Sequence, residues 1–192
     1  FPGSNGDRDL LEALNLSGFS ARLHPAQQAL PQDVQLVGLP GGFSYGDYWR
    51  AGMLASRARA VQSLPALIAA GGLVIGVCNG FQILVEAGIL PGALSYNQPP
   101  RFVHRWIEVE VTAAAARSHS PWFRQSRVGS RLRLPIAHAE GRYVHPQGDA
   151  VIATRVPLVY CENPNGSLAD TAAVLDDSGR VLGIMPHPER AC

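Results

Sequence analysis

Two short, continuous apolar runs constrain the fold of this chain more than any other feature of its sequence. They are VQLVGL at residues 34–39 and LVIGV at residues 73–77, and each leads into a glycine-containing turn. Strands that helices cover on both faces of a parallel sheet have such runs, because neither face meets water. Helix-like segments accompany them, with leucines at helical spacing over residues 7–16 and an alanine-rich stretch over residues 53–70. The first half of the chain therefore predicts an α/β fold in which helices flank a mainly parallel sheet.

The second half of the chain has a different pattern. Residues 105–111 alternate between apolar and polar side chains, as a half-buried strand does. Turns rich in glycine and proline separate the further strand candidates. These candidates lie at residues 131–138, 150–161, 172–175 and 181–185. The sequence therefore predicts a strand-rich C-terminal half.

Composition excludes several classes of protein. With 192 residues, of which 46% are hydrophobic and 16% charged, the chain is long enough to bury a core and too apolar to be disordered. We therefore expect a single domain over residues 1–192. The net charge of +1 gives no bulk attraction to nucleic acid or to a membrane surface, and no apolar run is long enough to span a bilayer. All 16 basic residues are arginine, which excludes Schiff-base chemistry and a lysine-dependent phosphate loop.

The cysteines indicate a reducing compartment. Cys78, Cys161 and Cys192 form an odd and sparse set, which is a poor framework for disulfides. We therefore expect a cytoplasmic protein. Cys161 lies in an apolar stretch, where a core position is expected, and Cys78 is the strongest candidate for chemistry.

Residues 76–80, which read GVCNG, have the spacing of a nucleophile elbow with cysteine as the nucleophile. In such a turn from strand to helix, small residues flank the nucleophile because the backbone is strained and its neighbours are close. The N-terminus of the following helix favours the thiolate of Cys78, and the backbone N–H of Asn79 faces a developing oxyanion. The alternative is a buried structural cysteine, which is common among free cysteines.

His187 is the best candidate for a base that serves this cysteine. It follows the apolar stretch at 181–185 in the segment MPHPER at 185–190, and the prolines on either side restrict its backbone. In an extended chain, His187 and Glu189 point to the same side, so the carboxylate would orient the imidazole. An exposed loop is the alternative for an isolated His-Pro-Glu sequence.

The glycine-rich loop at residues 40–47 follows the first apolar run. Glycines in this loop allow backbone N–H groups to turn towards a ligand, as an oxyanion hole requires. A phosphate-binding loop is disfavoured, since the chain lacks lysine and the G-x-x-x-x-G-K-[ST] pattern. A plain turn between strand and helix remains the simpler alternative.

Together these segments resemble the class I (triad) glutamine amidotransferases. The family signature G-x-C-x-G-x-Q appears at residues 76–82 and H-P-E at residues 187–189. Longer matches resemble the glutaminase subunits of a synthase in purine biosynthesis: PGGFSYGDYWRAG at 40–52 and ENPNGS at 162–167. The resemblance covers essentially the whole chain and implies a flavodoxin-like α/β fold.

The resemblance also implies a mechanism and a set of site residues. Cys78 would attack the side-chain amide of L-glutamine, His187 would transfer the protons and Glu189 would orient His187. Main-chain N–H groups near Gly42, Phe43 and Asn79 would stabilise the oxyanion. The residues that the resemblance assigns to the glutamine pocket are Gln82, Ser44, Tyr45, Arg101 and Phe102. The motif AHAEGRY at 137–143 places His138 and Glu140 at the pocket rim or at a subunit interface.

The partners follow from the same resemblance. Ammonia would pass to a large synthetase subunit, which uses ATP and Mg²⁺ to aminate formylglycinamide ribonucleotide, and a small accessory subunit would complete the complex. The chain itself is expected to need no metal or cofactor and to bind neither nucleic acid nor membrane. Because relatives usually begin with a strand before Phe1 and continue beyond HPER, we expect this chain to lack elements at both ends.

Three other functions remain open at this point. The short signatures also fit a glutamine amidotransferase of another pathway, although PGGFSYGD and ENPNGS argue against it. A γ-glutamyl hydrolase on a related fold is disfavoured by Gln82. A silent subunit that only regulates or scaffolds the synthetase is disfavoured by the intact Cys78, His187 and Glu189.

Overall fold

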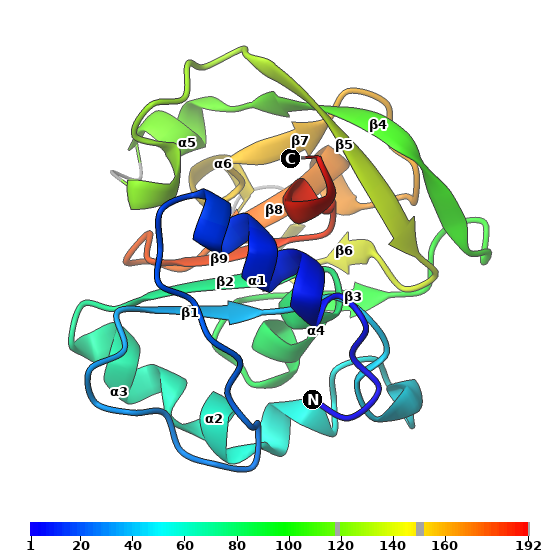
Figure 1. Cartoon of the computed structure of the whole chain (residues 1–192). Coiled ribbons are helices and arrows are strands. Elements are labelled where there is room, and N and C mark those ends of the chain that lie inside the picture. Colours follow the sequence, from blue (N-terminus) through cyan, green and yellow to red (C-terminus); the bar gives the residue numbers. More distant parts are fainter. Residues whose placement is uncertain (118–119, 149–151, 192) are drawn as a thin grey trace.

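A sheet of seven strands, in the order β1-β2-β9-β8-β7-β4-β5, organises the molecule (Figure 1). The structure is a computed structural model that describes residues 1–117, 120–148 and 152–191. The strands of this sheet are β1 (Leu36–Leu39), β2 (Leu73–Val77), β4 (Val103–Val111), β5 (Arg131–His138), β7 (Leu158–Tyr160), β8 (Thr171–Leu175) and β9 (Val181–Ile184). A separate antiparallel pair consists of β3 (Ala93–Ser95) and β6 (Arg142–Val144).

Parallel pairing is confined to one side of the sheet. β1 pairs with β2, and β2 with β9, in parallel, whereas each pairing from β9 through β8, β7 and β4 to β5 is antiparallel. The predicted α/β class and the strand-rich C-terminal half are confirmed. The parallel share is smaller than expected, because the C-terminal strands join the same sheet by antiparallel pairing.

Helices α1 (Asp7–Leu16) and α4 (Asn79–Glu86) cover β1 from opposite faces. A Cβ atom added at Gly38 would lie 2.9 Å from the Leu10 side chain of α1, and one added at Gly80 of α4 would lie 2.1 Å from the carbonyl oxygen of Leu39. Neighbouring residues of a strand face opposite sides of the sheet, so α1 and α4 lie on opposite sides of β1. Such close helix–strand contact explains why glycine occupies these positions.

Two predicted segments differ from the structure. The alanine-rich stretch at 53–70 forms three short helices, η2 (Ala55–Arg57), α2 (Arg59–Gln62) and α3 (Leu64–Ala69), with Pro65 in the first turn of α3. The strand predicted over 150–161 is wrong: its described part contains the helix α6 (Ile152–Arg155) followed by the three residues of β7. Pro157, between them, has no N–H group to donate to a strand ladder.

Four more helical turns and one short helix lie in the connections that the structure describes. They are η1 (Ser44–Asp47), η3 (Pro121–Phe123), η5 (Leu168–Asp170), η6 (Pro188–Arg190) and α5 (Ala113–Arg117). Cys161 comes directly after β7 and is exposed, which corrects the expected core position, and Cys192 lies outside the described residues. No helix in the described ranges is long and apolar enough to cross a membrane.

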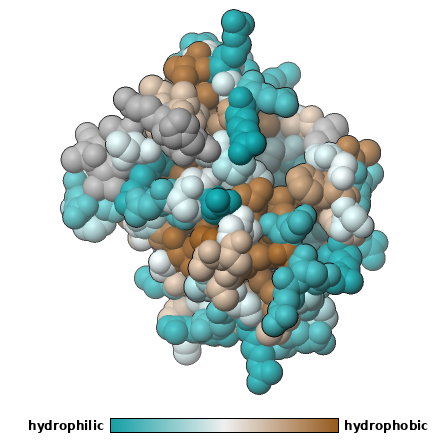
Figure 2. Space-filling model, turned by 90° about the vertical axis from the view of Figure 1, so that its left-hand side faces the viewer, coloured by the Kyte–Doolittle hydropathy of each residue, from teal (hydrophilic) through white to brown (hydrophobic). Residues whose placement is uncertain are grey.

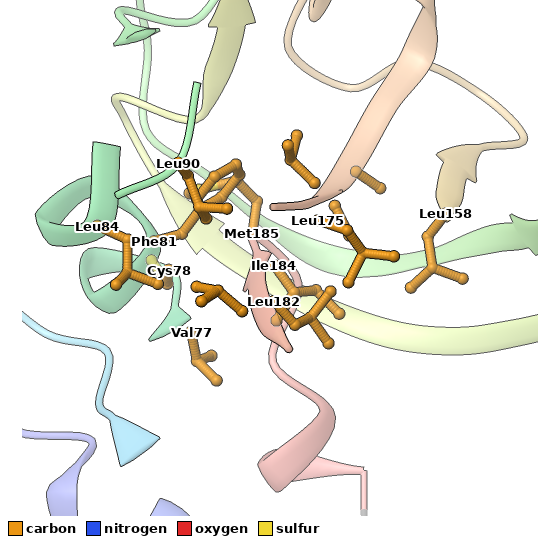
Figure 3. Close-up of a cluster of buried hydrophobic side chains, with 14 of the residues drawn as sticks. Val77, Cys78, Phe81, Leu84, Leu90, Leu158, Leu175, Leu182, Ile184 and Met185 are labelled. Carbon is orange, nitrogen blue, oxygen red and sulfur yellow. The ribbon is translucent and has the colours of Figure 1, made fainter. Parts of the chain in front are cut away.

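One part of the hydrophobic core lies between the sheet and α4. Figure 3 shows Cys78 beside Val77, Phe81 and Leu84, with Ile184 and Met185 of the neighbouring chain segment close by. Figure 2 shows apolar side chains gathered at the centre of another face, with hydrophilic residues around them. That face lies at the end of the sheet where β1 begins, whereas Cys78 follows the last residue of β2.

Candidate active site

Cys78 occupies the turn between β2 and α4. Its backbone has φ 49° and ψ −103°, a strained conformation for a residue with a side chain, and its N–H donates to the carbonyl of Ile184 at 2.8 Å. A Cβ atom at Gly76 would lie 2.5 Å from the carbonyl oxygen of Gly80, so the turn has room only for small neighbours. The strand–turn–helix geometry expected of an elbow is present.

The thiol of Cys78 is protonated in this environment. Burial is the main cause that raises its pKa to about 12; the Asn79 backbone N–H opposes this rise, and the nearby carboxylate of Glu189 adds to it. The sulfur lies 3.7 Å from the carbonyl oxygen of Ala137, to which the thiol donates. Burial therefore outweighs the helix N-terminus that was expected to favour the thiolate, and a base has to remove the proton during attack.

His187 and Glu189 form a buried pair next to Cys78. The Nδ1 atom of His187 lies 2.6 Å from Oε1 of Glu189, and only 2% of His187 is exposed. A Cβ atom at Gly41 would lie 2.8 Å from Cε1 of His187 and 3.6 Å from Cβ of Cys78, so both side chains flank the same glycine. The carboxylate occupies Nδ1, and Nε2 has no hydrogen-bond partner in the described part of the chain. Nε2 is therefore the atom available to exchange a proton with the thiol.

The loop after β1 forms the second wall of the site. Residues 1–6 fix this loop: the N–H of Gly6 donates to the carbonyl of Gly41 at 3.2 Å, and Ser4 forms a β-bridge with Gly42. The N–H of Phe43, one of the expected oxyanion donors, donates to the carbonyl of Gly3 at 3.4 Å. Among the expected donors, the N–H of Gly42 and the N–H of Asn79 at the start of α4 are therefore better placed.

These walls enclose a cavity of about 210 Å³. This is below the ~300–1,000 Å³ of typical pockets for drug-sized ligands, so the cavity suits a small substrate. The predicted site residues on its surface are Cys78, His187, Gly42, Phe43, Gln82 and Phe102. Glu189 does not line the cavity but contacts Nδ1 of His187. The Asn79 side chain does not line it either and accepts a hydrogen bond from the N–H of Ser44 in the loop after β1.

Three residues expected in the pocket do not line it. Ser44 is buried and its N–H donates to Oδ1 of Asn79 at 3.2 Å. The hydroxyl of Tyr45 accepts a hydrogen bond of 3.4 Å from Nε2 of Gln27, which does not line the cavity either. The Arg101 side chain is exposed to solvent. The loop lines the cavity through Gly42 and Phe43, and contacts with residues distant in sequence decide which of its other side chains face the cavity.

Gln82 connects two walls of the cavity. Its Nε2 donates to the carbonyl of Glu140 at 2.7 Å, and its Oε1 accepts from Nδ2 of Asn79 at 2.9 Å. Both ends of the amide are therefore engaged within the protein. Gln82 thus holds the wall formed by residues 137–140 against α4.

Sequence reasoning did not assign Asp47, Asn5 or Arg190 to the cavity, and it placed His138 and Glu140 only at a rim or interface, yet all five line the cavity. Burial and the nearby charge of Glu140 raise the pKa of Asp47 to about 6, whereas burial and His187 lower the pKa of His138 to about 4. Asp47 lies in the motif at 40–52, His138 and Glu140 in the motif at 137–143 and Arg190 in MPHPER at 185–190, whereas Asn5 lies in none of these motifs. No group of three or more His, Cys, Asp or Glu side chains suited to a metal ion occurs within residues 1–117, 120–148 and 152–191.

Known proteins resemble this chain over its whole length. The sequence profile of the CobB/CobQ-like glutamine amidotransferase domain matches residues 1–192. Phosphoribosylformylglycinamidine synthase subunit PurQ from Cereibacter sphaeroides is 44% identical, and the one from Rubrobacter xylanophilus is 47% identical; each alignment covers all of this chain and 86% of the relative.

Solved structures show the same relationship. A chain in the structure of PurLQS from Thermotoga maritima superposes with a TM-score of 0.89 at 41% identity, over all of this chain and 85% of that one. A second glutamine amidotransferase from Thermotoga maritima has a TM-score of 0.62 at 16% identity, over 94% of this chain and 69% of that one, which shows a shared fold.

Proposed function

Because the chain belongs to the family of CobB/CobQ-like glutamine amidotransferase domains, we propose that it is the glutaminase subunit of phosphoribosylformylglycinamidine synthase. The observation that carries this proposal is the arrangement at Gly41. The thiol of Cys78 and the imidazole of His187 flank this glycine in one small cavity, and Glu189 holds the far side of the imidazole. Relatives from several bacteria carry that subunit's name at 42–47% identity over this whole chain.

The first half of the reaction forms a thioester. Nε2 of His187 accepts the thiol proton of Cys78 as the sulfur attacks the side-chain amide carbon of L-glutamine. The negative charge that develops on the amide oxygen is stabilised by the N–H groups of Asn79 and Gly42. His187 then protonates the departing nitrogen, so ammonia leaves and a γ-glutamyl thioester remains on Cys78.

The second half restores the enzyme. Water gives a proton to Nε2 of His187 and attacks the thioester carbon, and His187 returns the proton to the sulfur as glutamate leaves. Glu189 keeps Nδ1 protonated throughout, which leaves Nε2 as the exchanging atom. Its negative charge stabilises the imidazolium that forms in each half of the reaction.

Ammonia is then used by a larger partner. The chain is a subunit of a complex with a larger synthetase chain, PurL, since its relatives are named as synthase subunits and a structural match is a chain in the structure of PurLQS. We assign the ATP- and Mg²⁺-dependent amination of formylglycinamide ribonucleotide to that large chain, in the cytoplasm. A small accessory subunit completes the proposed assembly, and this chain supplies no cofactor of its own.

Reconstitution tests this function. The chain is mixed with a large subunit and a small subunit, ATP, Mg²⁺, formylglycinamide ribonucleotide and glutamine, and the amidine product is followed. Product is expected only when both this chain and glutamine are present. Cys78→Ala is expected to abolish glutamine-dependent synthesis and to leave ammonia-dependent synthesis by the complex intact. Glutamine-dependent synthesis by that variant would remove Cys78 from the role.

A further inference from the structure

Two carboxylates line the same cavity as the thiol, and they come from different walls. Asp47 ends η1 in the loop after β1, and Glu140 follows β5. The two side chains are close enough for the charge of Glu140 to raise the pKa of Asp47, second only to the effect of burial. Among the described residues, no arginine or histidine forms an ion pair with either carboxylate, and the sequence contains no lysine. The cavity therefore carries two neighbouring negative groups that no ion pair among the described residues neutralises, since Arg190, which also lines the cavity, pairs with Asp9 and Glu189 instead.

The backbone of Asp47 is strained in order to hold this position. Its φ of 53° lies in the left-handed region, and Tyr45 has the same φ value. Aspartate tolerates this region better than most residues, but the conformation still has a free-energy cost. The carboxylate also accepts a hydrogen bond of 3.3 Å from Nδ2 of Asn79, which fixes its direction. The loop is thus built to keep an acidic side chain at the cavity.

His138 provides independent evidence that the cavity is built for a hydrogen-bond donor. It lines the cavity, only 3% of it is exposed, and its Nε2 has no hydrogen-bond partner within the ranges that the structure describes. Its Nδ1 lies 3.1 Å from Oδ1 of Asn97. Asn97 donates from Nδ2 to the carbonyls of Arg101 and His138, and its Oδ1 accepts from the N–H of Gly141.

This network fixes the proton on His138. Because Oδ1 of Asn97 is an acceptor, Nδ1 of His138 carries the hydrogen, and Nε2 of the neutral ring is an acceptor. A buried acceptor without a partner is costly unless a ligand supplies a donor. The cavity therefore offers acceptors from two carboxylates and one imidazole, which together suit a cationic N–H donor.

We propose that Asp47 and Glu140 bind the α-ammonium group of the amino-acid substrate and thereby restrict the site to amides with a free α-amine. The proposal rests on the proposed glutaminase function. In glutamine the α-nitrogen is separated from the reacting amide carbon by three carbon atoms, so both groups fit in one small cavity with Cys78. The single positive charge of the ammonium group would neutralise part of the negative charge on Asp47 and Glu140. The N–H groups of the ammonium match the acceptors on the cavity walls.

An ammonium group fits this pair better than a metal ion does. Asp47 and Glu140 do not belong to any cluster of three or more potential metal ligands among the described residues. Their walls are instead joined by amide hydrogen bonds through Asn79 and Gln82. Asp47 and Glu140 are consequently specificity residues, distinct from the groups that move protons.

The test uses the reconstituted synthase and two amide substrates. One is L-glutamine, and the other is 4-carbamoylbutanoate, which has the same chain and amide but lacks the α-amine. Wild-type chain is expected to prefer glutamine in kcat/KM by ~100-fold or more, since a site built to bind a polar group rejects an analogue without it. Asp47→Asn and Glu140→Gln are each expected to raise KM for glutamine by ~10-fold or more, to change kcat little and to reduce that preference. Asp33→Asn, an exposed acid at the far end of the sheet, is the matched control and is expected to behave as wild type.

A second measurement separates this proposal from the function on which it rests. Alkylation of Cys78 is timed with iodoacetamide and with a chloroketone analogue of glutamine that keeps the α-amine. Asp47→Asn should slow the chloroketone and leave iodoacetamide unchanged, while ammonia-dependent synthesis shows that the variant folds and assembles. An unchanged chloroketone rate together with an unchanged preference would overturn the proposal. If wild-type synthase does not use glutamine, the proposed function fails, and the two alkylation rates still decide the role of Asp47.

Discussion

The parallel and antiparallel parts of the sheet contribute different kinds of groups to one cavity. The parallel strands β2 and β9 lead into Cys78 and into the His187–Glu189 pair, which carry the proposed chemistry. The antiparallel strand β5 ends at His138 and leads into Glu140, and both residues line the cavity with the acceptors proposed to bind the substrate. Parallel strands end at the same edge of a sheet, so they bring residues distant in sequence to one place. The comparison teaches that the proposed reacting groups all follow parallel strands, whereas the proposed recognition groups come from both parts, since Asp47 lies in the loop after the parallel strand β1.

The two parts also hold their residues by different means. On the parallel side, glycines at 41, 76 and 80 bring backbone and side chains into close contact, and any side chain there would collide with a neighbour. On the antiparallel side, the amide of Asn97 holds His138 through buried hydrogen bonds. Packing around the glycines fixes the position of the backbone. The hydrogen bonds of Asn97 fix the orientation of the His138 ring and the nitrogen that carries its proton. The following predictions test that contrast.

The largest effect is expected from Glu189→Gln on the parallel side. The amide cannot stabilise the imidazolium of His187 or hold Nδ1 protonated as the carboxylate does, so kcat for glutamine should fall by ~10²–10⁴-fold. The equivalent change on the antiparallel side, Glu140→Gln, should act mainly on KM. Steady-state glutaminase kinetics of the reconstituted synthase compare the two variants. A fall in kcat of similar size in both would abolish the division between reaction and recognition.

A smaller but still large effect is expected from Gly80→Ala. The new methyl group would lie 2.1 Å from the carbonyl oxygen of Leu39, which is backbone and cannot move independently. We expect a loss of about 3 kcal/mol in the free energy of unfolding, measured by urea denaturation. Gly88→Ala is the control, since its methyl group would meet nothing within 4 Å and only its φ of +71° opposes the change. That control should lose about 1 kcal/mol, and equal losses would show that crowding does not hold the elbow.

The free energy of unfolding is expected to depend on pH through His138, which lies on the antiparallel side. Burial and His187 lower the pKa of His138 to about 4 from an ordinary 6.5, so the unfolded chain binds more protons than the folded chain between these values. The contribution of the buried neutral His138 ring to the free energy of unfolding is complete above pH 6.5. As the pH falls towards 4 this contribution is lost, and the loss is at most about 3 kcal/mol. Asp47, with its raised pKa, has the opposite slope, because its contribution is lost as the pH rises towards 6.

Urea unfolding across this pH range tests the assignment. His138→Gln should remove the loss that appears between pH 6.5 and 4, and Asp47→Asn should make it steeper. His104→Gln provides the control, because His104 is an exposed histidine that does not line the cavity. Identical pH profiles for wild type and His138→Gln would mean that the imidazole is not buried as a neutral ring.

The smallest effect is expected at the surface of the antiparallel part. Arg131 lies 3.7 Å from the carboxylate of Glu108 and 3.5 Å from that of Glu110, and all three side chains are largely exposed. Exposed ion pairs contribute little, so Arg131→Ala should change the free energy of unfolding by less than about 1 kcal/mol. Thermal melts at low and high salt measure it. A larger loss that disappears in salt would show that charge, rather than buried hydrogen bonds, supports this part of the sheet.

Local sequence patterns predicted the parts of the molecule whose causes are local. The apolar run at 73–77 is β2, the motif at 76–80 forms the strand–turn–helix elbow, and α1 spans the segment with leucines at helical spacing. The strand expected over 150–161 failed because its apolar residues suit either a buried helix or a strand. Periodicity alone does not distinguish those two cases.

The recognition wall could not have been derived in this way. His138 is oriented by Asn97, which precedes it by 41 residues and belongs to no motif that suggests contact. Likewise, the hydroxyl of Tyr45 accepts a hydrogen bond from Gln27, outside the cavity, whereas Asp47 lines the cavity and accepts one from Asn79. Motifs predicted which loops meet at the site, but contacts between distant segments decide which side chains face the substrate.

The position of β9 has a consequence for how the chain becomes active during synthesis. β9 pairs with β2 on one side and with β8 on the other, although the ribosome makes it after all other strands of the sheet. Until β9 inserts, β2 has only β1 as a neighbour, and closing the sheet requires contacts between segments far apart in the chain, which slows folding. The same segment brings His187 to Cys78. A nascent chain that has already formed its cysteine turn therefore lacks the proposed base beside the thiol, and in the proposed mechanism glutamine is not consumed before the sheet is complete.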